Sequence, residues 1–138
     1  MEKIKEFRGE WRFLSNFWPA EVTYNRRKFK TVENAYQAAK CVNVGDQQAI
    51  QMMSPGGAKR FGKVLGGMRR LDWNDKTKLA IMKDLLRQKF QDPELCQKLL
   101  ATGDSLLEEG NYWHDTFWGR NPPILAPLLN LSRLFRLS

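Results

Sequence analysis

The stretch that most constrains the fold is 31–40, which reads TVENAYQAAK. Its three alanines favour a helix, and the hydroxyl of Thr31 can accept a hydrogen bond from a free backbone N–H of the first turn. Apolar residues recur at the three-and-four spacing of one buried helix face, at Val32, Ala35, Ala39 and Val42. We therefore expect a helix that begins after Thr31 and packs against the core.

A second face of this helix carries four different functional groups. A carboxylate, a phenol, an amide and an amine share the same spacing, at Glu33, Tyr36, Gln37 and Lys40. A small substrate lying along two helical turns could contact all four. The alternative is that Glu33 only offsets the positive end of the helix dipole and that Lys40 is a solvated surface residue.

The length of 138 residues suits one domain with one core, and a hydrophobic content of 42% is typical of globular proteins. No apolar run reaches the ~20 residues of a membrane span. Residues 1–6 lack the apolar region of a signal peptide. These features predict a cytoplasmic protein without a membrane partner.

Metal and charge patterns narrow the chemistry further. Cys41 and Cys96 form no CxxC pair, and His114 is the single histidine, so a zinc set is missing. We expect two reduced, buried thiols, no metal and no cofactor. The formal net charge of +8 favours an anionic partner, either nucleic acid or a phosphorylated small molecule.

Turn residues and helix caps divide the rest of the chain into short elements. The aromatic segment 7–19 predicts a short strand followed by a loop, and Gly62 with Gly66-Gly67 indicates another loop. The other expected elements are a hairpin (21–24 and 28–30), helices over 46–53 and from Ser54-Pro55, and a helix from Asp72 or Asn74 to about Phe90. That last helix has an apolar stripe of Leu79, Met82, Leu86 and Phe90.

The sequence predicts one more helix and one more strand after it. The helix runs through Leu95, Leu99 and Leu100; Asp92 caps its start, and Thr102-Gly103 ends it. The strand lies near 106–109.

The C-terminal segment 120–138 is rich in leucine and apolar nearly all round, which predicts a helix buried against the domain or a partner. The chain shows no internal repeat and no linker. Together these patterns predict an α+β fold, predominantly α-helical, with a small β hairpin, as a single domain spanning 1–138.

Three loops combine aromatic rings with polar groups: 15–18, 72–73 and 115–119. The rings of Trp73 and Trp118 can stack a flat heterocycle, although either could instead be a core packing residue. Carboxylates at Glu33 and Asp115 could move a proton or stabilise a developing cation. Arginines that could hold a phosphate are Arg12, Arg60, Arg69 and Arg70.

This set of residues suits cleavage of a glycosidic bond in a phosphorylated nucleoside-like molecule. The transition state is positively charged at the anomeric carbon, so a carboxylate stabilises it, and an acid protonates the leaving nitrogen. His114 and Asp115 are not interpreted as an acid–base pair, because neighbours in sequence rarely face one another.

Seven short motifs together resemble the NADAR family, the YbiA-like N-glycosidases. Any one motif is weak, but their order and spacing from about Phe7 to Gly119 are specific. They are 13–17 (FLSNF), 31–40, Ser54-Pro55 with Ala58-Lys59, 69–73, Lys89-Phe90, 99–104 and 115–119.

The resemblance implies a helix-dominated α+β fold and cleavage of an N-glycosidic bond. Members of the family are associated with phosphorylated ribosylamino-pyrimidine intermediates of riboflavin biosynthesis, and others remove ADP-ribose from guanine bases. The Glu, Trp and Asp implicated in the family fall on Glu33, Trp73 and Asp115. The family's helix lysine falls on Lys40, where a Schiff base with an opened ribose has been considered.

Two positions depart from the family pattern. The family usually has His after the helix Glu, whereas this chain has Asn34, which weakens any mechanism that needs an imidazole there. The family usually continues past its Trp-Gly with a Gly-rich stretch and a polar helix, whereas this chain reads RNPPIL over 120–125. The divergent segment 120–138 could narrow or change the substrate.

These patterns predict a metal-independent N-glycosidase of a phosphorylated ribosylamino-pyrimidine, or alternatively an enzyme that removes ADP-ribose from guanine bases of nucleic acid. We assign Glu33 as the acid/base or electrostatic carboxylate, Asp115 as the second carboxylate and Lys40 as nucleophile or phosphate contact. We expect Glu33, Trp73 and Asp115 to converge on one cleft. The residues expected to contact the substrate are Asn16, Phe17, Tyr36, Gln37, Arg69, Trp73 and Trp118.

Two other classes of function remain open. A non-catalytic nucleic-acid-binding module would explain the net charge and the aromatics, but the basic residues do not form one stripe. The leucine-rich segment 120–138 would instead suit a subunit that binds a protein partner. The sequence does not predict the oligomeric state.

Overall fold

The computed structural model describes residues 3–4, 9–65, 69–101 and 106–107. They belong to two compact units, one formed by 16–89 and the other by 1–15 together with 90–138. In chain order the elements of the first unit are β2 (Val22–Tyr24), β3 (Arg27–Phe29), α1 (Val32–Ala39), α2 (Val44–Gln51), α3 (Pro55–Lys63) and α4 (Asp75–Lys89).

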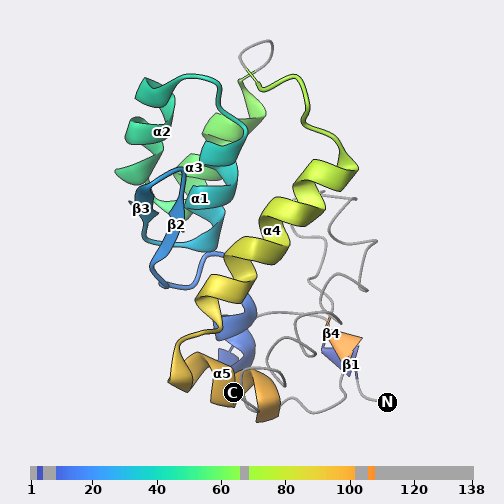
Figure 1. The fold of residues 1–138 in the computed structure, drawn as a ribbon. Helices are drawn as coiled ribbons and strands as arrows, with labels where there is room; N and C mark the ends of the chain where they lie inside the picture. Colours follow the sequence, from blue (N-terminus) through green and yellow to red (C-terminus); the bar gives the residue numbers. More distant parts are fainter. Residues whose placement is uncertain (1–2, 5–8, 66–68, 102–105, 108–138) are drawn as a thin grey trace. The chain divides into compact units, whose positions relative to one another are not determined.

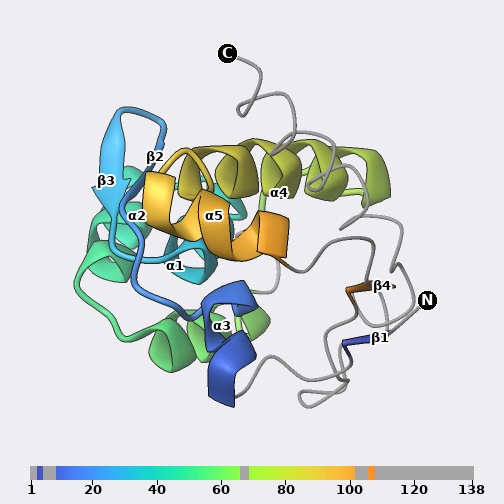
Figure 2. The same cartoon turned by 90° about the horizontal axis from the view of Figure 1, so that it is seen from below.

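Helix α1 is the central element of the 16–89 unit. All eight of its residues are buried, because α2, α3, α4 and both strands of the hairpin pack against it. Figure 1 shows α1 between α2 and α4, and the perpendicular view places it between α3 and α4 (Figure 2). Any polar side chain of α1 therefore needs partners inside the protein.

The hairpin that leads into α1 is confirmed. Strands β2 and β3 are antiparallel, with Val22 opposite Phe29, and both of these side chains are 1% exposed. The two turn residues Asn25 and Arg26 have φ of 50° and 64°. This left-handed conformation matches the twist of a two-residue hairpin.

Side-chain caps confirm where three of the predicted helices begin. Backbone N–H groups three residues on donate to Thr31, Ser54 and Asn74 at 3.0, 3.0 and 2.9 Å. Asn74, rather than Asp72, is thus the cap of α4. The helix predicted over 46–53 is α2.

The described residues of the second unit form β1 (Lys3–Ile4), the 3₁₀ helix η1 (Gly9–Leu14), α5 (Pro93–Ala101) and β4 (Leu106–Leu107). Strand β1 runs parallel to β4, with Lys3 opposite Leu106, so the predicted strand near 106–109 is confirmed at its start. Asp92 caps α5 through its Oδ1, as predicted.

The strand expected within 7–19 is wrong, because the chain forms η1 there. Phe13 and Leu14 are 4% and 5% exposed, so two neighbours in sequence are both buried. A strand would direct them to opposite faces, whereas a helical turn can bury both. The N–H of Ser15 donates to the carbonyl of Arg12 at 3.0 Å, which is the spacing of a 3₁₀ turn.

Four details of the helices also differ from expectation. Val42 is 62% exposed because α1 already ends at Ala39, and Leu79 is 36% exposed because burial along α4 begins at Met82. Leu85, which was not in the predicted stripe, is fully buried. Gly62 lies inside α3 rather than in a loop.

The expected helix end at Thr102-Gly103, the polar loop 111–119 and the leucine-rich segment 120–138 lie outside the described residues. Within the described ranges, every helix is too short or too polar to cross a membrane.

Candidate active site

The start of α1 is fixed by two contacts with earlier parts of the chain. The N–H of Glu33 donates to the carbonyl of Asn16 at 3.0 Å, and Thr31 caps the helix. The side-chain amide of Asn16 lies 3.8 Å from the sulfur of Met82 in α4. The loop carrying Asn16 thus holds the first turn of α1, on which the candidate carboxylate stands.

Glu33 and Gln37 form a buried polar pair on α1. Their side chains are 6% and 3% exposed, and Gln37 Nε2 donates to Glu33 Oε1 at 2.9 Å. The two positions are one helical turn apart, so their side chains lie on one face. Removing a carboxylate from water is costly unless donors replace the lost hydration, and the Gln37 amide is one such donor.

A cluster of rings and one ammonium group occupies the same face. The ring centroids of Tyr36 and Trp73 are 5.3 Å apart at 58°, the tilted geometry that aromatic pairs prefer. Lys40 Nζ lies 5.4 Å from the Tyr36 centroid and 5.9 Å from that of Trp73. We call Tyr36, Lys40 and Trp73 the aromatic–lysine cluster; the structure brings these three predicted site residues together.

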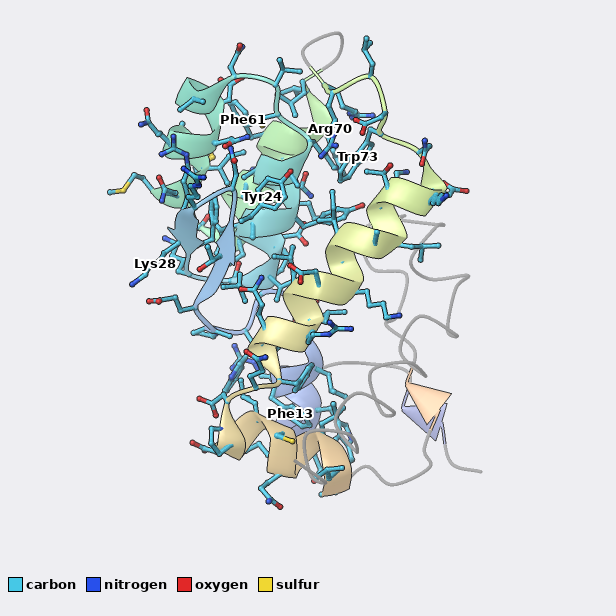
Figure 3. The ribbon with its side chains drawn as sticks, in the orientation of Figure 1. Phe13, Tyr24, Lys28, Phe61, Arg70 and Trp73 are labelled. Atoms are coloured by element: carbon cyan, nitrogen blue, oxygen red, sulfur yellow. The ribbon has the colours of Figure 1, made fainter. Side chains whose placement is uncertain are left out.

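Two arginines attach the loop before Trp73 to the C-terminal end of α1. Arg69 pairs with Cys41 in a β-bridge, and its guanidinium donates to the Gly62 carbonyl at 3.3 Å. The N–H of Arg70 donates to the carbonyl of Lys40 at 2.8 Å. Figure 3 shows Arg70 and Trp73 beside this end of α1. Arg69, predicted as a substrate contact, thus supports the loop that carries Trp73.

The Arg70 side chain makes further bonds that fix its position. It donates to Tyr24 Oη at 3.1 Å and to both carboxylate oxygens of Asp72. The hydrogen bond from Arg70 lowers the pKa of Asp72 and raises that of Arg70 itself. This bidentate pair closes the turn immediately before Trp73.

Asn34, the departure from the family pattern, bonds to the end of α2. Its Nδ2 donates to the carbonyls of Ile50 and Met53, both at 2.9 Å, and its Oδ1 accepts from the Thr31 hydroxyl at 2.6 Å. Asn34 is 0% exposed. The Asn34 side chain thus joins α1 to the end of α2. The sequence did not indicate this structural role.

Gly62 and Lys89 are two further residues whose environment the sequence did not reveal. Gly62 lies on α3 directly against the Gln37 amide, and its place within a helix could have been read from the Ser54-Pro55 start of α3. Lys89 in α4 is 1% exposed, an unusual degree of burial for a lysine. Lys89 belongs to the Lys89-Phe90 motif of the family resemblance, but that motif gives no indication that its side chain is buried.

Of the remaining predicted substrate contacts, Phe17 is described and Trp118 is not. Phe17 places its ring about 4.0 Å from where a side chain on Gly56 would begin, beside the first turn of α3. Asp115, Trp118 and His114 lie outside the described residues. The expected convergence of Asp115 with Glu33 and Trp73 stays a prediction.

In the described part of the chain, no group of three or more His, Cys, Asp or Glu side chains is placed to hold a metal ion. Neither Cys41 nor Cys96 forms a disulfide; Cys41 is buried, as expected, whereas Cys96 is only partly buried. Burial, with a smaller contribution from Asp46 and opposition from Lys40, raises the pKa of the Cys41 thiol to about 11.

Curated relatives share most of this chain. A riboflavin biosynthesis protein of Vibrio vulnificus is 34% identical over 109 residues, which are 78% of this chain and 29% of that protein. An N-glycosidase of Nostoc punctiforme is 36% identical over 111 residues, 77% of this chain and 70% of that protein. A chloroplastic riboflavin biosynthesis protein of Zea mays is 37% identical over 123 residues, 77% of this chain and 19% of its own length. This chain therefore spans less than a third of the Vibrio and Zea proteins.

The fold is also that of a solved structure. YbiA of E. coli, determined by NMR, superposes with a TM-score of 0.79 at 27% identity, over 100% of this chain and 90% of that one. This likeness confirms the predicted helix-dominated α+β fold. The NADAR domain matches residues 5–122. The resemblance inferred from the motifs is thus confirmed, and the chain belongs to the NADAR domain family.

Proposed function

We propose that this chain hydrolyses the N-glycosidic bond of a phosphorylated ribosylamino-pyrimidine. The observation that carries the proposal is the buried Glu33 carboxylate, which Gln37 holds on the helix that also bears Tyr36 and Lys40. The names of the relatives support the reaction and the substrate, since one is an N-glycosidase and two are riboflavin biosynthesis proteins.

In the proposed reaction, the bond between the anomeric carbon and the pyrimidine amino nitrogen breaks. Positive charge develops on the sugar, and the Glu33 carboxylate stabilises it or removes a proton from the attacking water. The water oxygen bonds to the anomeric carbon, and the leaving nitrogen takes a proton. Asp115 is proposed as the second carboxylate, which supplies that proton.

The aromatic–lysine cluster suits the rest of the substrate. Trp73 offers a ring face for a pyrimidine, and its tilted contact with Tyr36 fixes its plane. Lys40 supplies positive charge for a phosphate. In this proposal Asn16 and Phe17 contact the substrate. Arg69 lies near it and also holds the loop that carries Trp73, through its hydrogen bond to the Gly62 carbonyl.

Lys40 has two possible roles that chemistry can separate. The aromatic faces stabilise an ammonium group, which suits a phosphate contact, whereas a nucleophile needs the neutral amine. Borohydride added during turnover traps a covalent adduct on Lys40 if it is the nucleophile, and Lys40→Arg then abolishes activity. Retained activity in Lys40→Arg, with a raised KM and no adduct, assigns the phosphate contact.

The test of the proposed function offers substrates to the protein and follows products by mass spectrometry. One arm contains a ribosylamino-pyrimidine phosphate, and a second contains an oligonucleotide ADP-ribosylated on guanine. We expect release of the sugar phosphate in the first arm, unchanged by EDTA. Turnover only in the second arm would show that the substrate is an ADP-ribosylated base and not the pyrimidine. No turnover in either arm would overturn the proposed function.

A third arm addresses the non-catalytic alternative by measuring RNA and DNA binding at several salt concentrations. Steep salt dependence without turnover would assign a nucleic-acid-binding module. The proposal includes a cytoplasmic location, which is supported by two cysteines that form no disulfide. Fractionation of cells that express the protein checks this location.

A further inference from the structure

Helix α3 contacts the Glu33–Gln37 pair through a glycine. A Cβ atom added at Gly62 would lie 1.8 Å from Gln37 Oε1, 2.7 Å from Gln37 Cδ and 3.4 Å from Lys40 Nζ. The first two separations are far below any normal contact between such atoms. Gly62 is also buried. The Gln37 amide thus occupies the space that any other residue at position 62 would fill.

The Gln37 amide makes a hydrogen bond to Glu33 through its nitrogen and contacts Gly62 through its oxygen. Its Nε2 donates to Glu33 Oε1 at 2.9 Å. Among the residues that the structure describes, no donor reaches its buried Oε1, which faces Gly62. The hydrogen bond to the carboxylate fixes which end is nitrogen, because an ionised carboxylate only accepts. With 3% of Gln37 exposed, the displaced amide would find little room elsewhere.

We propose that Gly62 and Gln37 form a positioning device for Glu33, in which the missing side chain of Gly62 lets the Gln37 amide lie flat against α3 and point its N–H at the carboxylate. Gln37 is then a positioning residue rather than the substrate contact that the sequence suggested. This inference rests on the proposed function for its effect on turnover, but its geometric part does not.

The first test adds one methyl group. Gly62→Ala is expected to lower kcat by about 10-fold with KM within twofold, since Glu33 loses its orientation while the substrate contacts remain. Gly56→Ala is the matched control on the same helix, because a Cβ there meets Arg60 and Phe17 only at ordinary distances of 3.6 and 4.0 Å. An unchanged kcat in Gly62→Ala would overturn the inference.

A double-mutant cycle shows whether the methyl group acts through Gln37. In a Gln37→Ala background, Gly62→Ala is expected to cause no further loss, because the space is already vacated. Equal losses in both backgrounds would overturn the inference. Should Gly62→Ala fail to fold, Gln37→Met serves instead: it keeps the length of the side chain and removes the donor. A 10-fold lower kcat at unchanged KM supports the inference, and full kcat overturns it.

Two measurements separate this inference from the proposed function. If Glu33→Gln is inactive while Gln37→Met is fully active, the positioning device fails and the proposed function stands. If Glu33→Gln is fully active, the proposed function fails. Crystal structures of the two alanine variants then still test the geometry. The Gln37–Glu33 hydrogen bond should be lost in Gly62→Ala and kept in Gly56→Ala, and its survival in Gly62→Ala would overturn the inference.

Discussion

Two neighbouring residues of α1, Glu33 and Asn34, belong to polar groups of opposite character. Asn34 has both amide N–H groups and its amide oxygen bonded to Ile50, Met53 and Thr31. The partner of Glu33, Gln37, instead keeps an amide oxygen that no described donor reaches. Asn34, whose amide is fully hydrogen-bonded, stabilises the fold. The Glu33–Gln37 pair, which keeps an amide oxygen without a described donor, is the one that we connect to catalysis.

The helix itself produces this division. Successive residues of an α-helix are about 100° apart, so positions 33 and 34 face different neighbours. Asn34 meets the C-terminal end of α2, where unpaired carbonyls need donors. Glu33 shares its face with Gln37, which in turn lies against α3. The burial of a polar side chain therefore does not by itself identify a functional site. The number of its hydrogen-bonding atoms that have partners is more informative.

The largest effect should come from removing the charge of Glu33. Glu33→Gln should keep the fold and lower kcat by about 10²-fold or more, because the developing cation loses its carboxylate. Glu21→Gln is the matched control, since Glu21 is an exposed residue paired with Lys28 at 3.6 Å. Steady-state kinetics and thermal melting measure both. Full activity in Glu33→Gln would show that Glu33 is not the catalytic carboxylate, so that it no longer differs from Asn34 in function.

Asn34→Ala should act on stability instead. It leaves the Ile50 and Met53 carbonyls without their donor, and we expect the free energy of unfolding to fall by about 2–4 kcal/mol. Urea denaturation measures the loss, and kcat of the folded variant should stay within about threefold. Asn43→Ala is the control, because Asn43 makes no side-chain bond at the start of α2. A large loss of kcat without destabilisation would place Asn34 in the site.

Trp73→Ala tests whether the aromatic–lysine cluster belongs with Glu33 or with the core. Stacking of a base is worth roughly 1–3 kcal/mol, so KM should rise by about 5- to 150-fold, with partial rescue by Trp73→Phe. The structure leaves Trp73 half-buried, as expected of a ring that is open to a ligand. A variant that melts early and binds substrate normally would show that Trp73 is a packing residue.

The smallest expected effect concerns Cys41, whose thiol donates to the Gln37 carbonyl at 3.6 Å. Its pKa of about 11 in the folded protein is above the ordinary thiol value of 9.0. The neutral thiol is therefore favoured by folding, and this stability is complete at pH values below about 9 and lost as the pH rises toward 11. Between pH 8 and 10, the wild type should lose about 1 kcal/mol more than Cys41→Ala in denaturant unfolding. Parallel pH profiles of the two proteins would contradict this expectation.

Much of the local structure follows from the sequence, because caps and turns act over a few residues. Thr31, Ser54, Asn74 and Asp92 each lie where their side chains can bond the next free N–H groups, and the helices begin there. The strand expected within 7–19 is wrong because a run of aromatic residues does not distinguish a strand from a 3₁₀ turn. The difference depends on which neighbours bury Phe13 and Leu14.

Tertiary contacts decided the rest of the candidate site. The sequence determined that Glu33, Tyr36, Gln37 and Lys40 share one face of α1, because helical periodicity depends only on their spacing. It could not determine that Trp73 returns to this face, since the Arg70 bonds to Tyr24 and to the end of α1 join residues dozens of positions apart. Nor could it reveal why position 62 is glycine, because the space for the Gln37 amide exists only where α3 packs against α1.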